Sequence, residues 1–550
     1  MRTLVALLLL TAPAGADPLP FDVPTMHEEA RAAGIEHSYR GPWEFFVGGG
    51  AASFDCNGDR RPDLFLAGGA GESKLYVNRS RVGDTLRFER RSIDVPSRDL
   101  TKVTGAWPLD IDSDGQMDLF VARVGGNVVL RGEGDCTFSK SNRRFGLDPG
   151  RAWTTAFAAT WESGAPLPTL AVGNYVDRTA PGSPFGTCES NQLLRPENGT
   201  YSRAQSLDGF CALSLMFTDW NASGEPALRV TNDRQYHRGG YEQLWRVPAG
   251  RAAKQLTPAD GWRRFAIWGM GIAQADLNND GRPEYALTSM GDTKLQALDE
   301  AGLDEDRPSY EDRAAALGAT AHRPYTGGDI RPSTGWHAQF ADFNNDARTD
   351  LFVAKGNVEA MGDFAAYDPD NLLLGAPDGR FVETGEQAGI ALRTRGRGAV
   401  VEDFNMDGML DLLVVNRGAN VSLFRNRGEA VEWGHRPMGN WLAIELDQQA
   451  PPPAAQGRVP NRRAVGARIV VRTGNHIQTR FVTVGGGHGS GQAGFTHVGL
   501  GAAERATVRV RWPDGEWSHE VRTHAGNFVV IRRDAPQAAY WYPIDPDEGD

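Results

Sequence analysis

Oxygen-bearing side chains recur along this chain at positions 1, 3, 5 and 9 of a nine-residue loop, D-x-[DN]-x-D-x-x-x-[DE]. Calcium is a hard cation that takes six to eight oxygen ligands in flexible geometry, which such a loop provides when its backbone curls. Magnesium demands stricter octahedral geometry, so the loops favour Ca²⁺ at about five sites. The candidate metal ligands in the five intact copies are Asp55, Asn57, Asp59, Asp63, Asp110, Asp112, Asp114, Asp118, Asp276, Asn278, Asp280, Glu284, Asp342, Asn344, Asp346, Asp350, Asp403, Asn405, Asp407 and Asp411.

The charge of the chain supports a bound cation. The net charge is -12, and sixteen of the candidate ligands are Asp or Glu, so the rest of the chain is net positive. Three or four carboxylates packed in one loop repel each other unless a cation neutralises them. An acidic chain also argues against nucleic acid as a partner, because phosphate binding needs a basic surface.

The loop has two other interpretations. An EF-hand opens in the same way, but it ends on a Glu at position 12 and lies between helices. Metal-free turns rich in Asp and Asn are the second alternative, and five copies in register argue against them. The EF-hand is excluded because position 12 is apolar in every intact copy, as Leu66, Val121, Leu287, Val353 and Val414.

The copies are not equal. Position 6, where Gly permits a sharp turn, is Arg60 in the first copy and Ala347 in the sixth, so both are expected to bind more weakly. A decayed copy begins at Asp219 and has Ala227 at position 9. Another begins at Trp161 and is expected to be empty. The seven copies begin at residues 55, 110, 161, 219, 276, 342 and 403.

Each copy leads into a short apolar run that predicts a buried strand. The spacing leaves room for about four strands in each repeat, and seven such units close most simply into a circle without open sheet edges. We therefore expect an all-β fold, with a seven-bladed β-propeller over residues 17–435. Apolar and polar residues alternate in residues 440–533, which predicts a small β-sandwich or barrel domain. Residues 534–550 form an acidic tail that is expected to be loose.

Residues 1–16 have the pattern of a signal peptide: Arg2, a run of seven apolar residues and a small-x-small cleavage site. The alternative, an N-terminal anchor helix, needs about 20 apolar residues. We expect a secreted or periplasmic protein without a membrane span. Arginine outnumbers lysine 52 to 6, which favours a bacterial source.

The four cysteines agree with export, because even numbers of Cys in exported chains usually form disulfides. Three pairings and four free thiols are open. We favour Cys188–Cys211, since both lie in one polar, Gly-rich stretch, which leaves Cys56–Cys136.

Other motifs do not indicate catalysis. The Gly-rich residues 485–491 lack the G-K-[ST] ending of a phosphate loop and are expected to form a flexible connection. His337 precedes the sixth loop by five residues, and a structural role is favoured for it. No H-E-x-x-H motif occurs, so no catalytic residue is assigned and the chain is not expected to be an enzyme.

The loops resemble the FG-GAP/VCBS repeats of integrin-α-type propellers. With the phrases at residues 21–35, 268–276 and 397–403, and the C-terminal blocks at 461–468, 485–487, 499–501 and 510–515, the chain resembles the CRTAC/ASPIC-UnbV family. The resemblance implies adhesion, that is, a non-catalytic module that binds a protein or glycan. An extracytoplasmic enzyme acting on polysaccharide, or a structural subunit of an envelope complex, are the alternatives. The sequence determines neither the ligand nor the oligomeric state.

Overall fold

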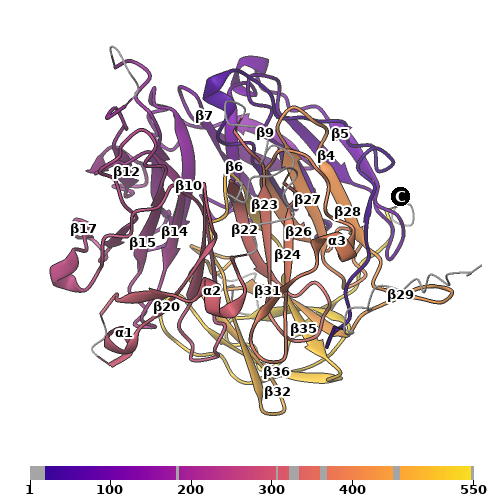
Figure 1. Cartoon of the computed structure of the whole chain (residues 1–550). Helices are drawn as coiled ribbons and strands as arrows, with labels where there is room; N and C mark the ends of the chain where they lie inside the picture. The colour runs from indigo at the N-terminus through magenta and orange to yellow at the C-terminus, as the bar shows by residue number, and fades with distance from the viewer. Residues whose placement is uncertain are drawn as a thin grey trace, which may run out of the picture.

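The computed structural model describes residues 19–180, 185–304, 307–320, 334–358, 368–449 and 459–546. The predicted signal peptide at residues 1–16 therefore lies outside the described residues. Within them the regular secondary structure consists almost wholly of short strands, as the apolar runs predict (Figure 1). No helix in these ranges has the length and apolar character to cross a membrane.

Seven antiparallel sheets follow one another along the described chain from residue 26 to residue 426. Within a sheet, hydrogen-bonded neighbours are consecutive in sequence, with two exceptions: β1 (Met26–Glu28) completes the seventh sheet beside β28, and a strand from the C-terminal part of the chain joins the first sheet beside β2. The first three sheets contain β2 (Ala51–Phe54), β3 (Asp63–Leu66), β4 (Lys74–Asn78) and β5 (Phe88–Arg91); β6 (Val103–Leu109), β7 (Asp118–Arg123), β8 (Val128–Gly134) and β9 (Thr137–Lys140); β10 (Thr154–Thr160), β11 (Thr169–Asn174), β12 (Asn191–Leu194) and β13 (Ala204–Leu207). The other four contain β14 (Ala212–Thr218), β15 (Ala227–Asn232), β16 (Gln243–Arg246) and β17 (Lys254–Gln255); β18 (Gly269–Ala275), β19 (Glu284–Ser289), β20 (Lys294–Leu298) and β21 (Tyr310–Asp312); β22 (Gly335–Ala341), β23 (Asp350–Lys355), β24 (Asn371–Gly375) and β25 (Phe381–Glu383); β26 (Gly396–Glu402), β27 (Asp411–Asn416) and β28 (Ser422–Asn426).

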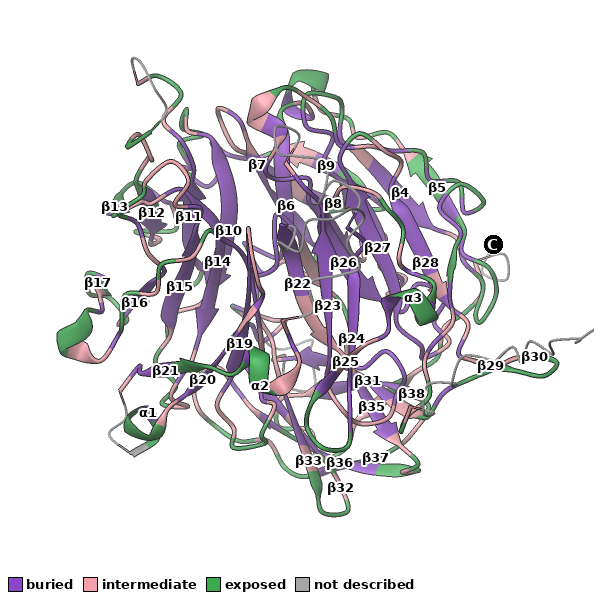
Figure 2. Cartoon of the chain, viewed as in Figure 1, coloured by how far each residue is buried: buried purple, intermediate pink, exposed green. Residues whose placement is uncertain are grey.

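The repeated loop connects the first and second strands of each sheet. In every intact copy the second strand begins at position 9, so that Asp63 starts β3 and Asp411 starts β27. These second strands are buried, except that Arg123 at the end of β7 is partly exposed, because both of their faces pack on neighbouring sheets (Figure 2). The first strand of each sheet contacts that of the next, and β26 contacts β2, which closes the circle. This arrangement of small antiparallel sheets is typical of a β-propeller.

Residues 440–449 and 459–546, here called the C-terminal segment, form two four-stranded sheets that pack on one apolar core, which includes Leu442, Ile469 and Val508. The first sheet has the order β35 (Thr496–Gly501), β31 (Asn440–Asp447), β38 (Asn527–Arg532) and β39 (Ala539–Trp541). The second has the order β33 (His476–Phe481), β32 (Arg468–Thr473), β36 (Arg505–Arg511) and β37 (Val521–His524).

The expectation of a loose tail is wrong up to residue 546. Strand β39 pairs with β38, and Trp541 packs against Phe495 and Phe528. Burial of this aromatic side chain offsets the loss of chain entropy that ordering requires.

The remaining elements are short. The helices are α1 (Glu300–Asp304), α2 (Ala314–Leu317) and α3 (Gly385–Ala388), with 3-10 turns at Trp43–Phe45, Ser97–Asp99 and Pro258–Asp260. A hairpin of β29 (Glu429–Val431) and β30 (Gly434–Arg436) precedes the C-terminal segment. The pairing predicted for the cysteines is confirmed, since Cys188 is bonded to Cys211 and Cys56 to Cys136.

The Gly-rich connection is not the flexible loop that its composition predicts. Residues 484–490, here called the central segment, lie between the first strands of the seven sheets and are buried apart from the half-buried Gly485, with His488 fully enclosed. Glycine is required there, because a Cβ on Gly487 would lie 2.2 Å from the His337 ring. Strand β34 (Gly491–Ala493) then pairs in parallel with β2. Hydrogen bonds join the central segment to six first strands, through Ala51, Ala106, Ala159, Leu215, Ile272 and His337.

Candidate metal centres

The backbone of every intact loop is wound around the carboxylate at position 1. In the seventh copy the Gly408 N–H donates to Asp403 Oδ2 at 2.8 Å, and the Asp407 N–H donates to Oδ1 at 3.0 Å. The turn places position 6 in the left-handed region, where φ is +84° at Gly408. Arg60 and Ala347 adopt the same conformation at φ of 62° and 69°, so the missing glycines do not alter the loop backbone.

The carboxylate at position 9 fastens the loop to the sheet. Asp411 accepts the Phe404 N–H at 3.0 Å and, through its other oxygen, the Asn426 N–H of β28 at 2.8 Å. The first, second and sixth copies have the same pair of bonds, and Asp63, Asp118 and Asp350 are fully buried as a result. The residue at this position therefore organises the loop as well as offering oxygen to a cation.

The side chain at position 3 shows whether the loop could hold a metal ion. The Asn405 amide donates to Asp407 Oδ2 at 3.0 Å, and Asn344 makes the equivalent bond to Asp346. The Oδ1 atoms of both asparagines are buried and have no hydrogen-bond partner among the described residues. A buried oxygen without a donor is costly, and a cation at the centre of the loop would satisfy it. These residues fit calcium.

Burial raises the pKa of the carboxyl groups at positions 1 and 9 of the intact loops, and the neighbouring carboxylates add to the effect. The pKa of Asp110 rises to about 6, those of Glu284 and Asp342 to about 7, and that of Asp118 to about 8. In the second copy one oxygen from each of Asp110, Asp112 and Asp118 lies within 4.8 Å of the others. A cation would relieve the repulsion that this geometry imposes.

The second copy also has a cation of its own. Arg131 Nε donates to Asp112 Oδ2 at 3.0 Å, and the same guanidinium pairs with Asp114. Arg144 pairs with Asp112 from another side, at 3.1 Å. The carboxylates at positions 3 and 5 of this loop are thus already partly neutralised.

In each of the two decayed copies, arginine pairs with a carboxylate of the loop, Asp219 or Glu162. In the copy that begins at Asp219, the Gly224 N–H still donates to Oδ2 at 2.9 Å, and the same oxygen pairs with Arg468 at 2.5 Å and Arg511 at 3.4 Å. In the copy that begins at Trp161, Glu162 pairs with Arg195.

The C-terminal segment covers the face on which the loops lie. Arg60 of the first loop pairs with Glu445 at 3.0 Å, and the His497 ring is hydrogen-bonded to Asn345 of the sixth at 2.7 Å. Trp441 rests on Gly408 of the seventh loop, so closely that a Cβ there would lie 1.8 Å from the indole. Figure 1 shows the yellow C-terminal strands beneath the circle of sheets.

The predicted ligands are thus gathered loop by loop, on the face that the C-terminal segment covers. His337 accepts a hydrogen bond from the His488 N–H at 3.0 Å, which is the structural role favoured for it. The spacing of residues along the chain did not predict that Arg468 and Arg511 pair with Asp219, because Asp219 is 249 and 292 residues away from them.

The comparisons with known proteins agree with the resemblance. A family model described as ASPIC and UnbV matches residues 457–538, and one described as FG-GAP-like repeat matches residues 55–121 and 342–414. The chain therefore carries FG-GAP-like repeats followed by an ASPIC and UnbV segment. Cartilage acidic protein 1 of Mus musculus is 28% identical over 278 residues, which cover 48% of this chain and 36% of that protein.

Cartilage acidic protein 1 of Homo sapiens is 28% identical over 285 residues, covering 44% of this chain and 38% of that protein. The matches thus span less than half the length of these relatives. Among solved structures, the extracellular domain of a hybrid two-component system protein from B. thetaiotaomicron aligns with a TM-score of 0.40 and 9% identity. That alignment covers 94% of this chain and 59% of the other chain.

Proposed function

We propose that this chain is an extracytoplasmic, calcium-binding, seven-bladed β-propeller that acts as a non-catalytic module for binding a protein or glycan. Residues 440–533 would form a separate β domain docked on the metal-loop face. The observation that carries the calcium assignment is the set of buried loop oxygens that lack donors, at Asn344 and Asn405. The two disulfides support an oxidising, extracytoplasmic location.

The proposed calcium sites are the five intact loops, because arginine supplies the positive charge in the other two. In the fourth copy Arg468 and Arg511 approach Asp219 from the C-terminal segment. In the third, Arg195 neutralises Glu162 from its own sheet. Among the intact loops the second is expected to be the weakest, since calcium there competes with Arg131.

Titration of calcium-free protein with CaCl₂ by isothermal calorimetry tests this assignment. We expect about five equivalents to bind, and the substitution Asp403→Asn to remove one of them. Asp219→Asn is the matched control, because it alters position 1 of a loop that arginine already neutralises. Loss of an equivalent from Asp219→Asn, or no loss from Asp403→Asn, would contradict the assignment.

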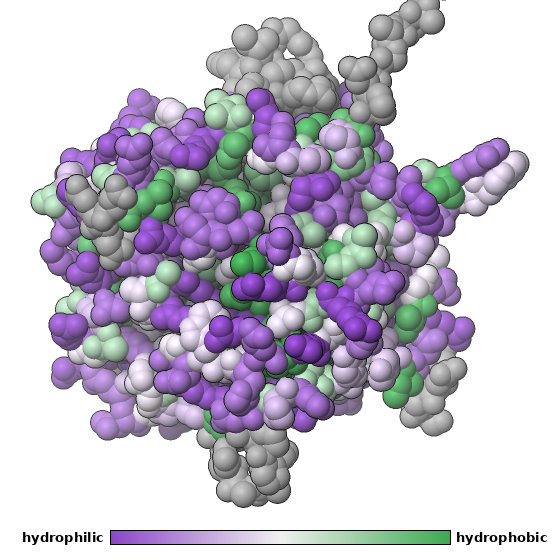
Figure 3. Space-filling model, turned by 90° about the horizontal axis from the view of Figure 1, so that it is seen from below, coloured by the Kyte–Doolittle hydropathy of each residue, from purple (hydrophilic) through white to green (hydrophobic). Residues whose placement is uncertain are grey.

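The non-catalytic role is supported by the filled centre of the circle of sheets. The central segment occupies the space between the first strands, where His488 and Ser490 are buried. In the view of Figure 3 the outer surface is mainly hydrophilic, with small, separate hydrophobic areas. Binding at such a surface would rest on polar contacts made by loops that the calcium sites hold in place.

A glycan array and a panel of extracellular-matrix proteins, each probed with and without calcium, test the binding role. We expect at least one class of ligand to be retained with calcium and released by chelator. Hydrolysis or elimination products from polysaccharide substrates would instead favour the enzyme alternative.

The stabilisation by calcium is expected to depend on pH. The loop carboxyl groups with raised pKa values, from about 6 at Asp110 to about 8 at Asp118, hold protons that calcium must displace. Metal-free protein loses stability as pH rises from the ordinary carboxyl range up to these raised pKa values, since over that range the folded state binds more protons than the unfolded state. Calcium binding strengthens over the same range. The difference in melting temperature with and without calcium should therefore grow from pH 5 to pH 8.

A difference in melting temperature that is constant from pH 5 to pH 8 would contradict this. Asp118→Asn, which removes the carboxyl group with the highest of these pKa values, should weaken the pH dependence in the second loop.

Arg468 is expected to be needed for docking of the C-terminal segment. Its side chain is 9% exposed and also donates to the Gly281 carbonyl at 2.8 Å. Arg468→Ala leaves the longer contact from Arg511 as the ion pair of Asp219 among the described residues, and should cost about 2 kcal/mol of unfolding free energy after allowance for the partial exposure of Asp219. Urea unfolding in excess calcium measures this.

Arg472→Ala is the control for Arg468→Ala, because Arg472 lies on the same strand, β32, and is exposed. Equal costs for the two substitutions would contradict a specific role for Arg468.

A further inference from the structure

Two connections between strands are rich in arginine and aromatic residues and contain no acidic residue. They are residues 234–241, between β15 and β16, and residues 261–268, between β17 and β18. Together they hold four arginines, five aromatic residues and no Asp or Glu. The chain as a whole has a net charge of -12, so these connections form a local exception to its acidic composition.

Both connections lie on the face opposite the C-terminal segment. Neighbouring strands of each sheet are antiparallel, so the connections that leave the second and fourth strands lie at the opposite end from the metal loop. The fold brings the two connections together. The Glu242 N–H donates to the Phe265 carbonyl at 2.8 Å, and Arg234 Nη1 donates to the Ala266 carbonyl at 3.4 Å. Residues 234–241 and 261–268 thus form one surface, here called the arginine surface.

Two exposed arginines of this surface are held by aromatic rings and not by carboxylates. The Arg264 guanidinium lies 4.9 Å from the centroid of the Tyr241 ring, and that of Arg238 lies 5.8 Å from the centroid of Phe185. Neither guanidinium makes an ion pair with any described residue. A guanidinium that rests on a ring keeps its N–H edge available to an anion, because the edge and not the face carries the donors.

Apolar surface and a hollow accompany these cations. A pocket of about 450 Å³, open to solvent, lies between Phe185 and residues 236–239. The Phe185 side chain is 51% exposed, and Trp268, which ends the second connection, is 40% exposed. The Arg234 guanidinium lies 5.4 Å from the centroid of the Trp268 ring. The volume of the pocket is within the range of ligand sites.

We propose that the arginine surface binds an anionic polysaccharide, a chain of sugar units that carry sulfate or carboxylate groups. This inference rests on the binding role proposed above and names its ligand. Arg238 and Arg264 pair with the charged groups, because the planar fork of a guanidinium matches an oxyanion. The exposed rings of Phe185 and Trp268 pack on the apolar C–H faces of the sugar rings.

Other ligands fit this surface less well. A nucleic acid is bound tightly through about six to ten phosphate contacts, whereas two arginines here have no hydrogen bond to a described residue. An acidic polypeptide offers charge without a sugar ring for Phe185 and Trp268. A neutral polysaccharide makes no use of the arginines.

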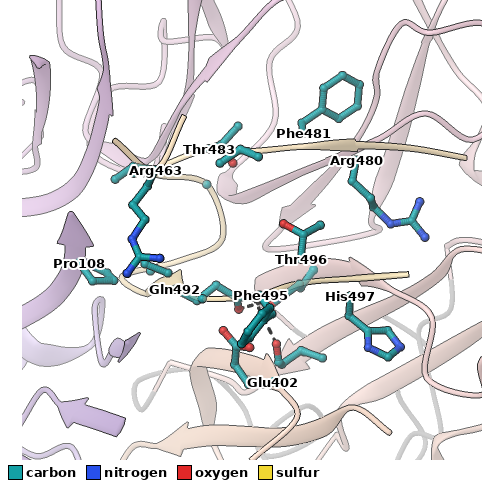
Figure 4. A pocket seen from close by; sticks show the side chains of 18 of the residues that line it. Pro108, Glu402, Arg463, Arg480, Phe481, Thr483, Gln492, Phe495, Thr496 and His497 are labelled. Atoms are coloured by element: carbon teal, nitrogen blue, oxygen red, sulfur yellow. Dashed lines mark hydrogen bonds between the residues drawn. The ribbon is translucent and has the colours of Figure 1, made fainter. Parts of the chain in front are cut away.

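The cavity on the other face of the circle of sheets is a separate site. It measures about 330 Å³ and lies between the circle of sheets and the C-terminal segment (Figure 4). Asp55, Asp110 and Asp403 of the metal loops are among its lining residues. Substitutions on the arginine surface therefore leave this cavity and the metal loops intact.

Biolayer interferometry with the full chain, saturated with calcium, tests the proposal against immobilised polymers. Dextran sulfate, carboxymethyl-dextran and unmodified dextran share one sugar backbone and differ in their charged groups. Poly-glutamate and single-stranded DNA carry charge without that backbone. We expect dextran sulfate or carboxymethyl-dextran to bind at least about tenfold more tightly than each of the uncharged dextran, poly-glutamate and DNA.

The double substitution Arg238→Ala, Arg264→Ala should weaken binding of the preferred polymer at least about tenfold, because hydrogen bonds to charged groups are the stronger ones. Trp268→Ala keeps the charge and should also weaken it. The matched control is Arg98→Ala, Arg393→Ala. It removes the same charge at exposed arginines of the same face, in the connections that lead into β6 and β26, and should keep full binding.

Equal binding of charged and unmodified dextran, or binding of poly-glutamate or DNA as tight as that of the charged dextrans, would overturn the proposal. Equal losses in the two double variants, or an unchanged affinity in Trp268→Ala, would also overturn it. Failure of both charged dextrans to bind would overturn it as well. If the chain then still retains a matrix protein in the presence of calcium, the binding role stands and only this ligand and surface are wrong.

Discussion

Removal of calcium with excess EGTA is expected to lower the melting temperature of this protein by roughly 10 °C or more. A site filled at a hundred times its dissociation constant adds about 2.7 kcal/mol to the stability of the folded state. Five such sites sum to a large share of the unfolding free energy of any domain. The effect should be large here because the carboxylates at position 9, such as Asp350 and Asp411, are fully buried.

Differential scanning calorimetry with and without EGTA measures this change. Added CaCl₂ should restore the original melt, whereas MgCl₂ should restore little of it, because magnesium tolerates the irregular loop geometry poorly. If chelator leaves the melting temperature unchanged, calcium does not stabilise this fold. The loops would then be metal-free turns rich in Asp and Asn.

Gly408→Ala is expected to be the most damaging single substitution in the loops, costing at least about 3 kcal/mol. The new Cβ would lie 1.8 Å from the Trp441 indole, so either the loop or the C-terminal segment must move. The left-handed φ of +84° adds strain of about 1–2 kcal/mol for a residue with a Cβ.

Gly281→Ala separates these two causes. Gly281 occupies the same position of the fifth loop at φ +82°, and its Cβ would meet nothing within 4 Å. Gly281→Ala should lower the free energy of unfolding only by the backbone strain, as measured by urea unfolding in excess calcium. In a Trp441→Ala background, the loss of unfolding free energy caused by Gly408→Ala should fall to that caused by Gly281→Ala, which a double-mutant cycle detects. Equal costs in the natural background would show that Trp441 does not press on this loop.

The local features of the fold could be predicted from the sequence. Each loop leads directly into a buried strand, and the apolar runs at Leu64 and Leu412 are enough to place β3 and β27. The reason is that both features depend on residues a few positions apart, where spacing along the chain equals spacing in space. The clustering of the carboxylates within each loop follows from the same local geometry. The cysteine pairing could be predicted because four cysteines allow only three pairings.

The contacts between the circle of sheets and the C-terminal segment could not be predicted in this way. Asp219 and Arg468 are 249 residues apart, and no pattern along the chain connects them. The composition of the central segment predicts flexibility, because glycine carries no side chain that indicates packing. Its glycines instead permit close approach to the first strands, where Gly487 lies against His337.

By itself the sequence determined the repeat, the all-β character, the strands that follow each loop and the oxygen ligands offered to a cation. It could do so because these depend on short-range spacing and on the alternation of apolar and polar residues. Only the tertiary structure decided which carboxylates meet an arginine and which do not. It also decided that the C-terminal segment covers the loop face. Burial and long-range charge pairing arise only when distant segments pack, so they leave no local signature in the chain.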